Sequence, residues 1–321
     1  MRAVSRVVCV VVLACCAAIA GAQPYPSKPV RVIVPFPPGA GVDIVTRIFT
    51  PRLAAALGQQ FIVDNRSGAA GHIGAEVAAR AAPDGYTLLL APGSVVNSQT
   101  LYPKLTYNLE KDFDPITPVA AAPFVLVVHP SLPVRNVREL IALAKTKPGQ
   151  LYYASTGNGG TPHLAMEIFR MQANINVVHV PYKGTPSAVT DVIAGQVSMI
   201  FANTLSVLPL VKSGRLRALA VSSARRSAAV PELPTVSESG MPGFDATTWF
   251  GLLAPAGTPK EIITRINSES RKIGQLSGTR ELLISQGADA LGTTPEEFRA
   301  FIKAELVKWA KVVRTAGVKA E

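Results

Sequence analysis

The residues of this chain best suited to chemistry lie in glycine-rich turns. Three such turns stand where an expected strand meets an expected helix, at 35–41 (PFPPGAG), 65–71 (NRSGAAG) and 155–161 (STGNGGT). A turn of this kind leaves backbone N–H groups unpaired at a helix N-terminus, whose partial positive charge attracts anions. The first and third turns therefore predict a site for a carboxylate, whereas the second is interpreted as a tight connection. The candidate residues in these turns are Phe36, Pro38, Gly39, Ala40, Gly41, Ser155, Thr156, Gly157, Gly159 and Thr161.

Polar side chains also follow several of the expected strands at their carboxyl ends. Ser94, Tyr182 and Asn203 each come shortly after such a strand. In an open α/β sheet, ligands bind at the carboxyl ends of the strands. These three side chains can donate and accept hydrogen bonds without carrying a fixed charge. We expect them to contact the ligand, and we expect Lys183 to lie at the rim of the site.

Motifs for nucleotide binding and catalysis are absent from the sequence. Segment 157–162 (GNGGTP) has a proline where a dinucleotide fingerprint needs its third glycine, and no glycine-rich turn ends in Gly-Lys-Ser or Gly-Lys-Thr. The four histidines lack the spacing of zinc ligands, and there is no Gly-x-Ser-x-Gly segment for a serine nucleophile. We interpret Asp43 as a helix N-cap and His163 as a structural hydrogen-bonding residue. The sequence therefore predicts no catalytic residue, no metal site and no cofactor.

The N-terminal segment predicts export to the periplasm. An arginine-containing start is followed by an uncharged run that closes on Ala-Gly-Ala, which is typical of a signal peptide over residues 1–22 with cleavage after Ala22. A lipoprotein cut before Cys15 is the alternative, but Leu13 fits the required pattern poorly. All three cysteines lie in this leader, so the mature chain is expected to contain no disulfide.

Charge and composition argue against a nucleic-acid partner. The chain has 32 basic and 21 acidic residues and a formal charge of +11, but its basic residues are dispersed and its aromatic content is only 6%. Neither a basic stripe nor a stacking platform is therefore present. A basic exported protein more readily attracts anionic solutes. We expect a monomer that binds a small molecule.

The elements that must position these residues form two alternating series of strands and helices. Strand, loop and helix at this spacing predict right-handed crossovers and largely parallel sheets. The pattern breaks at 113–118 and then resumes. The expected strands are 30–34, 61–63, 87–90, 151–154, 177–180, 197–201, 216–221 and 250–254. The expected helices begin near residues 43, 73, 162, 186, 205 and 295.

The length of the chain and this double series predict an α/β protein with two domains. The tail after residue 254 is mostly helical and too small for a third domain, so it is expected to return to the first lobe. The chain would then cross between lobes twice, near 120–123 and 245–249. We assign 23–122 and 248–321 to a first lobe and 123–247 to a second, with the ligand cleft between them.

A set of short segments resembles the Bug-type receptors of tripartite tricarboxylate transporters. In chain order they are 25–29 (YPSKP), 34–39 (VPFPPG), 83–88 (PDGYTL), 180–184 (VPYKG), 216–221 (LRALAV), 252–259 (LLAPAGTP) and 294–298 (TPEEF). The resemblance covers essentially the whole mature chain. It implies a two-lobed periplasmic-binding fold of type II that closes over its ligand. It also implies that backbone amides and ordered waters around 36–41 hold a carboxylate, and that membrane transporter subunits are the partners.

The resemblance also indicates what the opposing lobe contributes and where this chain departs from the family. Relatives usually carry Gly-Gly where this chain has Gly39-Ala40, with a glycine displaced to Gly41. Many also carry an aspartate where this chain has Ala202. A carboxylate there would meet a ligand's ammonium group, so its absence favours a simple di- or aromatic carboxylate over an amino acid. The residues implied in the opposing lobe are Ser155, Gly157, Gly159 and the strand end 201–203.

Two other functions stay open from the sequence. A ligand-sensing subunit that passes its closed state to a membrane kinase fits the same fold, and a secreted hydrolase or lyase would use Asp43 or His163 in the cleft. Turnover separates the receptor from the enzyme, because a receptor returns its ligand unchanged. It does not separate the receptor from a sensing subunit, because a closed receptor can dock to either partner. The leading prediction is a receptor without enzymatic activity, whose ligand is a di- or tricarboxylate, an aromatic carboxylate or an amino acid.

Overall fold

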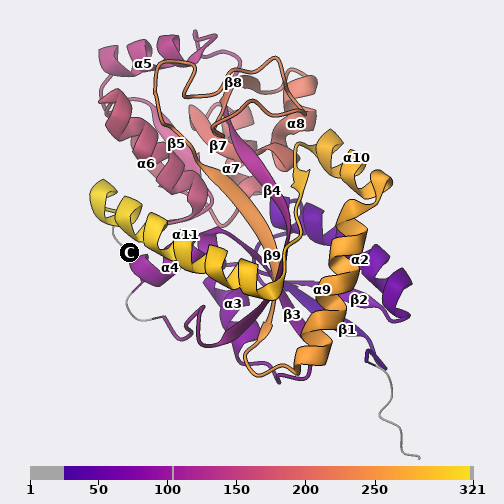
Figure 1. Cartoon of the computed structure of the whole chain (residues 1–321). Helices are drawn as coiled ribbons and strands as arrows, with labels where there is room; N and C mark the ends of the chain where they lie inside the picture. Colours follow the sequence, from indigo (N-terminus) through magenta and orange to yellow (C-terminus); the bar gives the residue numbers. More distant parts are fainter. Residues whose placement is uncertain (1–24, 103–104, 319–321) are drawn as a thin grey trace, which may run out of the picture.

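The computed structural model describes residues 25–102 and 105–318 of the 321-residue chain. The expected signal peptide, residues 1–22, lies outside the described residues. Within them, the chain folds into two α/β lobes joined by two long strands (Figure 1). The two-lobed α/β architecture expected from the sequence is confirmed.

Three parallel strands form the centre of the first lobe. The order of the strands is β2 (Phe61–Asn65), β1 (Val30–Val34) and β3 (Thr87–Pro92), with Val32 opposite both Val63 and Leu88. Four of the five β1 residues are buried, as expected for a parallel strand covered by helices on both faces. The helical elements that follow these strands are α2 (Gly41–Leu57), the 3₁₀ turn η1 (Ala69–Gly71), α3 (His72–Ala79) and α4 (Ser94–Leu101).

The second lobe repeats this arrangement around β5 (Tyr152–Ser155). This strand is parallel to both neighbours, β6 (Val178–Pro181) and β7 (Met199–Asn203). A further strand, β8 (Arg217–Val221), pairs with the strand that enters from the first lobe. The helices of this lobe are α5 (Val137–Thr146), α6 (Thr161–Ala173), α7 (Thr185–Ile193) and α8 (Thr204–Lys212).

Two long antiparallel strands join the lobes. Strand β4 (Phe113–Val128) pairs with β9 (Thr247–Pro255) as far as Pro123, and from Phe124 onward it pairs with β7 and β8 instead. The two expected crossings between lobes are therefore confirmed. These joining strands make the sheet mixed rather than largely parallel.

The expected break at 113–118 is wrong, because β4 runs through it. Its prolines Pro115 and Pro118 lie beside shifts in register against β9. A proline cannot donate to a strand ladder and is tolerated at such irregularities. Proline content therefore concealed the longest strand in the described part of the chain.

The C-terminal region adds three helices and a short strand. Helix α9 (Lys260–Gln275) packs on α2 and β4, and it leads to α10 (Ser277–Gln286) and β10 (Asp289–Ala290). Helix α11 (Pro295–Ala316) begins with a complete capping box, in which Thr294 and Glu297 bond to each other's backbone N–H. None of the helices in the described ranges is long and apolar enough to cross a membrane.

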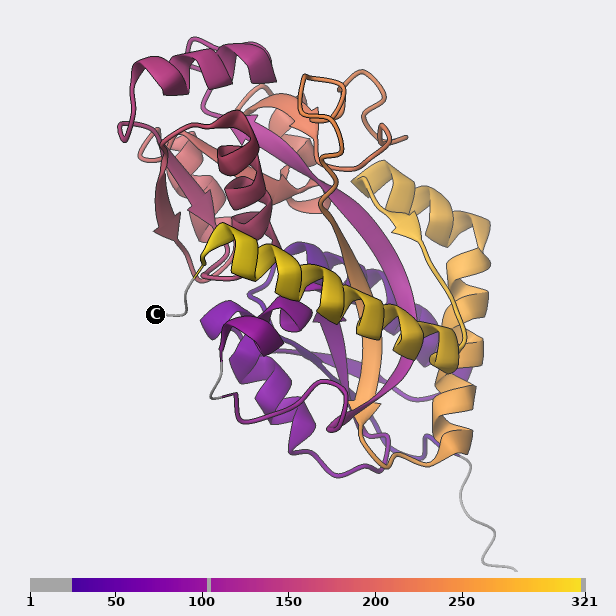
Figure 2. The same cartoon turned by 60° about the vertical axis from the view of Figure 1, so that its left-hand side comes forward.

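Helix α11 contacts both lobes. It packs along α4 and β4 of the first lobe and reaches α6 of the second (Figure 2). Its buried residues Phe298 and Trp309 belong to one apolar cluster that also contains Val95 of α4 and Phe169 of α6. The expectation that the C-terminal tail packs on the first lobe therefore describes only part of its contacts.

Candidate ligand-binding site

A cavity of about 50 Å³ lies between the lobes. Such a volume accommodates about four water-sized groups, roughly a carboxylate with its neighbouring carbon. None of the described residues that line it carries a charge. The lining residues are Phe36, Ala40, Gly41, Val42, Pro92, Ser94, Phe124, Thr156, Thr161, Pro162, Thr185, Asn203, Thr248 and Phe250.

Five helix N-termini converge on this cavity. The first residues of α2, α4, α6 and α7 line its wall, and so does Asn203, which caps α8. The first N–H groups of a helix have no partner within the helix and carry a partial positive charge. The cavity therefore combines an uncharged lining with the N-terminal ends of five helices, a combination that suits a small anion.

Ser94 has a hydroxyl group that no other described group satisfies. The residue is 5% exposed, and its Oγ makes no hydrogen bond among the described residues. A buried hydroxyl without a partner is costly to fold. Because Ser94 lines the cavity at the start of α4, a ligand oxygen would supply the missing bond.

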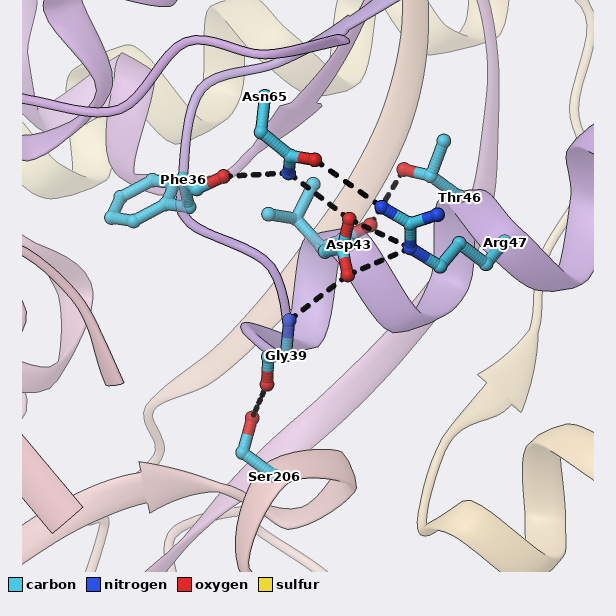
Figure 3. A network of polar contacts seen from close by, with 8 residues as sticks. Phe36, Gly39, Asp43, Thr46, Arg47, Asn65 and Ser206 are labelled. Carbon is cyan, nitrogen blue, oxygen red and sulfur yellow. Dashed lines mark hydrogen bonds and ion pairs between the residues drawn. The ribbon is translucent and has the colours of Figure 1, made fainter. Parts of the chain in front are cut away.

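The loop before α2 is held by a buried carboxylate (Figure 3). Asp43 Oδ2 accepts the Gly39 N–H at 2.9 Å, and Asp43 also accepts hydrogen bonds from Arg47 and Asn65. The Asn65 amide additionally donates to the Phe36 carbonyl at 2.9 Å. This network fixes the loop on one side of the cavity.

Asp43 is not the N-cap that the sequence suggested. The helix begins at Gly41 with Ala40 as its cap, and Asp43 reaches back to the loop from the third helical position. Burial alone would raise the pKa of Asp43, but the hydrogen bonds from Arg47, Gly39 and Asn65 lower that pKa below its ordinary value. The carboxylate is thereby stabilised in its charged, paired form and is a structural group.

The third glycine-rich turn is held by hydrogen bonds that two of its own amides donate to nearby side chains. Gly157 N–H donates to Ser155 Oγ at 3.2 Å, and Gly159 N–H donates to His163 Nδ1 at 3.0 Å. Ser155 Oγ also lies 2.6 Å from His179 Nε2. These two amides are therefore occupied, and the turn contributes Thr156 and Thr161 to the cavity wall instead.

The two histidines that bond to this turn belong to a stack of rings. The His163 and His179 rings lie parallel with centroids 3.9 Å apart, and Tyr153 stacks on His179 at 4.9 Å. Burial, with a smaller effect of nearby His179, lowers the pKa of His163 to about 4. A neutral His163 can accept the Gly159 N–H through Nδ1. The expected structural role of His163 is confirmed.

Residues 45–318 match the model of the tripartite tricarboxylate transporter family receptor. The chain belongs to this receptor family. It is 39% identical over 305 residues to Protein BugT of Bordetella pertussis, with 94% of each chain covered. The family resemblance predicted from the sequence is confirmed.

Solved structures of similar receptors carry carboxylate ligands. The structure of R. palustris Rpa4515 with adipate has 34% sequence identity and a TM-score of 0.90, covering 92% of this chain and 99% of that one. MatC from Rhodopseudomonas palustris with bound malate has 29% identity and a TM-score of 0.85, covering 90% and 100%. The periplasmic-binding-protein fold expected for this receptor is confirmed.

The structure brings seven of the thirteen predicted site residues of this receptor to the cavity wall. Pro38 and Gly39 are exposed and do not line the cavity, and Ser155, Gly157 and Gly159 also lie outside the lining. The predicted residues that line the cavity are Phe36, Ala40, Gly41, Ser94, Thr156, Thr161 and Asn203.

Tyr182 and Lys183 of this receptor line a second hollow at the mouth of the cleft. Pro37 and Ser67 of the first lobe form its other side. The Tyr182 hydroxyl donates to Asp191 at 2.6 Å, so it is engaged away from the inner cavity. The expectation that Lys183 lies at the rim agrees with its exposed position.

Several lining residues of this receptor were not predicted, and Thr185 is the most informative of them. The tripeptide Gly-Thr-Pro begins both α6 (160–162) and α7 (184–186), which was a usable signal. The other lining residues that were not predicted are apolar or lie on the two joining strands, where the sequence pattern is that of a buried core. They are Val42, Pro92, Phe124, Pro162, Thr248 and Phe250.

Ala202 of this receptor lies in the core of the second lobe. It is 1% exposed and packs in an apolar cluster with Val125 and Val207, and it is not part of the cavity wall. Within the described ranges, no group of three or more His, Cys, Asp or Glu side chains is arranged to hold a metal ion.

Proposed function

We propose that this receptor captures a small carboxylate between its lobes and delivers it to the membrane subunits of a tripartite transporter. The observation that carries the proposal is the convergence of five helix N-termini on a cavity with a neutral lining. Each such terminus stabilises an anion by about 0.3–1 kcal/mol at an exposed site, and more where water is excluded. The carboxylates in the adipate and malate complexes of similar receptors agree with this chemistry.

The carboxylate head group would be bound by backbone N–H groups and neutral hydroxyls. Ser94 Oγ is the strongest side-chain candidate, because it is buried and has no other partner among the described residues. Asn203 uses its Oδ1 to cap α8, by accepting the Leu205 N–H. None of the described residues that line the cavity is a carboxylate that could pair with a ligand's ammonium group, which favours a simple carboxylate over an amino acid.

Two hydrogen bonds between the lobes support a form in which the lobes close on the ligand. Ser206 of the second lobe donates to the Gly39 carbonyl of the first at 3.2 Å, and Asn97 of the first lobe donates to the Gly159 carbonyl of the second at 3.1 Å. Rotation about β4 and β9 would break both bonds. We assign 23–122 with 248–321 and 123–247 to the two moving lobes, and ligand binding shifts the balance toward the closed form.

The receptor is inferred to act outside the cytoplasm and to return its ligand unchanged. The leader over residues 1–22, cleaved after Ala22, supports export, and the mature protein acts as a monomer. Asp43 and His163, which an enzyme would need in the cleft, are both engaged in holding loops.

Native mass spectrometry of the exported protein tests this function. The expected result is a mature chain beginning at Gln23 that carries a small acid, followed by calorimetric binding of that acid without turnover. Adipate, malate and glutamate serve as comparison ligands, of which glutamate should bind most weakly. Conversion of the acid to a product, or tight binding of a cationic or neutral solute, would contradict the proposal.

A further inference from the structure

A buried carboxylate in α11 binds both tryptophans of the chain. Glu305 is 8% exposed, and its Oε2 accepts the indole N–H of Trp249 at 3.2 Å and that of Trp309 at 2.9 Å. Trp249 and Trp309 are the two tryptophans in the sequence. Hydrogen bonds to an ionised acceptor are roughly twice as strong as neutral ones. Glu305 therefore ties α11 to the strand that carries Trp249.

Trp249 lies where the chain crosses between the lobes. In β9 it stands opposite Ala121 of β4, two residues from the point at which β4 changes partners. The Phe298 and Phe301 rings meet its indole in T-shaped contacts, with centroids 5.4 and 5.7 Å away. These apolar contacts hold the plane of the indole, whereas the bond to Glu305 determines which way its N–H points.

Trp249 in turn fixes the start of α4. Its carbonyl accepts the Gly93 N–H at 2.9 Å, and its indole lies so close that a Cβ at Gly93 would be 3.0 Å from Nε1. Gly93 immediately precedes Ser94, the first residue of α4, whose hydroxyl has no hydrogen-bond partner among the described residues. Both the backbone and the indole of Trp249 therefore contact the residue that precedes Ser94.

The same short helix also contacts the opposite lobe. One turn after Ser94, Asn97 donates to the Gly159 carbonyl and to Thr161 Oγ1 at 3.1 and 3.2 Å. Helix α11 packs along α4 and continues to α6, the helix that Thr161 begins (Figure 2). A chain of direct contacts thus runs from Glu305 through Trp249 and Gly93 to both walls of the cavity.

We propose that Glu305 is a positioning residue for ligand binding: it orients Trp249, which holds the start of α4 and so places Ser94 against the ligand. Only the ligand part of this statement rests on the proposed function. The positioning of α4 is a property of the receptor alone and is measurable without any ligand.

Amide hydrogen exchange of Gly93 tests the positioning role. In Glu305→Leu the indole of Trp249 loses its hydrogen bond to the carboxylate of Glu305. The Gly93 amide, which Trp249 holds, should therefore exchange about tenfold faster or more. In Glu305→Gln the side-chain carbonyl can still accept the indole N–H groups, so exchange should stay within about threefold of the unaltered receptor. The reference is the Arg31 amide, which donates to the Tyr86 carbonyl in the same lobe.

Two further variants keep the test decisive. Glu167→Leu removes another buried glutamate, which accepts the Tyr153 hydroxyl in the second lobe, and it should leave Gly93 exchange unchanged. Trp249→Phe keeps the bond between Trp309 and Glu305 but removes the indole N–H at the crossing, so it should reproduce the faster exchange at Gly93. This variant answers the question if Glu305→Leu does not fold.

Two results would overturn the proposal. One is unchanged Gly93 exchange in Glu305→Leu, or in Trp249→Phe if the first variant does not fold. The other is an equal acceleration at Gly93 and Arg31, since Glu305 would then only stabilise the lobe as a whole. Calorimetry with adipate as the probe should show weaker binding for Glu305→Leu and rescue by Glu305→Gln. Failure of the unaltered receptor to bind adipate bears on the proposed ligand and leaves the exchange result standing.

Discussion

Pro37 and Gly184 meet across the mouth of the cleft, although they belong to different lobes. A Cβ atom at Gly184 would lie 2.6 Å from Pro37 Cγ and 2.8 Å from Pro37 Cδ. The backbone at Gly184 is extended, with φ 160°, so any residue can adopt it. Glycine is required there by the closeness of the proline ring in the closed form and not by backbone conformation.

Gly184→Ala should therefore impair closure without harming either lobe. The added methyl group meets Pro37 only when the lobes close, and overpacking of this kind costs about 1–3 kcal/mol. Ligand affinity should fall accordingly, by about 5- to 150-fold. Small-angle scattering with saturating ligand should show a radius of gyration closer to that of the ligand-free form.

The matched control is Gly278→Ala at the start of α10. No atom lies within 4 Å of a Cβ at that position, and its φ is not positive. This variant should bind ligand and close like the unaltered receptor. If Gly184→Ala also closes fully and binds with unchanged affinity, the contact with Pro37 does not define the closed form.

Ser94→Ala should weaken carboxylate binding while leaving the fold intact. A hydrogen bond from a buried hydroxyl to a charged oxygen is worth about 2 kcal/mol, or roughly 30-fold in affinity. Because Ser94 Oγ is buried and has no partner among the described residues, its removal should not lower the free energy of unfolding of the ligand-free receptor and should raise it by about 1 kcal/mol. Calorimetry and urea unfolding measure the two effects separately.

Ser98→Ala is the control for Ser94→Ala on the same helix. The Ser98 hydroxyl donates to the Ser94 carbonyl at 3.0 Å and does not line the cavity. Its loss should lower stability slightly and affinity little. Equal affinity losses in the two variants would show that the Ser94 hydroxyl makes no bond of its own to the ligand.

The positions of most strands along the chain and the two crossings were predictable because apolar runs and glycine-rich turns alternate regularly. Helix α4 was not predicted, since almost all of its residues are buried and it presents no polar face that would give a helical period. Helix α5 carried a usable signal in Asn136, which accepts the Glu139 N–H as an N-cap. Strand β4 was concealed by its prolines.

The location of the cavity was predictable, but its atomic details were not. Two of the glycine-rich turns contribute residues to its walls, because each of them leads into a helix that begins at the cavity. The sequence gives no indication of which amides remain free, since that depends on partners distant in the chain. Gly159, for example, donates to His163, and the first loop is held by Asn65.

Gly157→Val should reduce binding far more than Lys183→Ala does. Gly157 has φ +121°, which a β-branched residue rarely adopts, and a Cβ there would lie 3.4 Å from Ala70 of the opposite lobe. Lys183 is exposed at the mouth, so its removal should cost about 1 kcal/mol or less. Calorimetry on variants with verified melting temperatures decides the matter. Loss of binding in Lys183→Ala, with a neutral Gly157→Val, would mean that a side-chain cation holds the carboxylate.

The stability of the receptor should fall in acid partly because of His72. This residue is 8% exposed, and burial lowers its pKa from 6.5 to about 4. As the pH falls below about 6.5, the unfolded chain therefore takes up a proton before the folded chain does, and unfolding becomes more favourable. The shift corresponds to at most about 3 kcal/mol, lost progressively between about pH 6.5 and pH 4.

His72→Phe should make the receptor less sensitive to acid. The phenyl ring keeps the edge contact with Tyr102, at a centroid distance of 4.3 Å, while the titrating group is removed. The bond between Nδ1 and the Tyr107 hydroxyl, 3.3 Å long, is lost at a cost of about 1 kcal/mol. Tyr107→Phe removes the same bond but keeps the imidazole, so it should retain the original acid sensitivity. Urea unfolding of the unaltered receptor and both variants, from about pH 7 to pH 4, separates the lost hydrogen bond from the lost titration. Identical pH dependence of stability in His72→Phe and Tyr107→Phe would show that His72 does not titrate in this range.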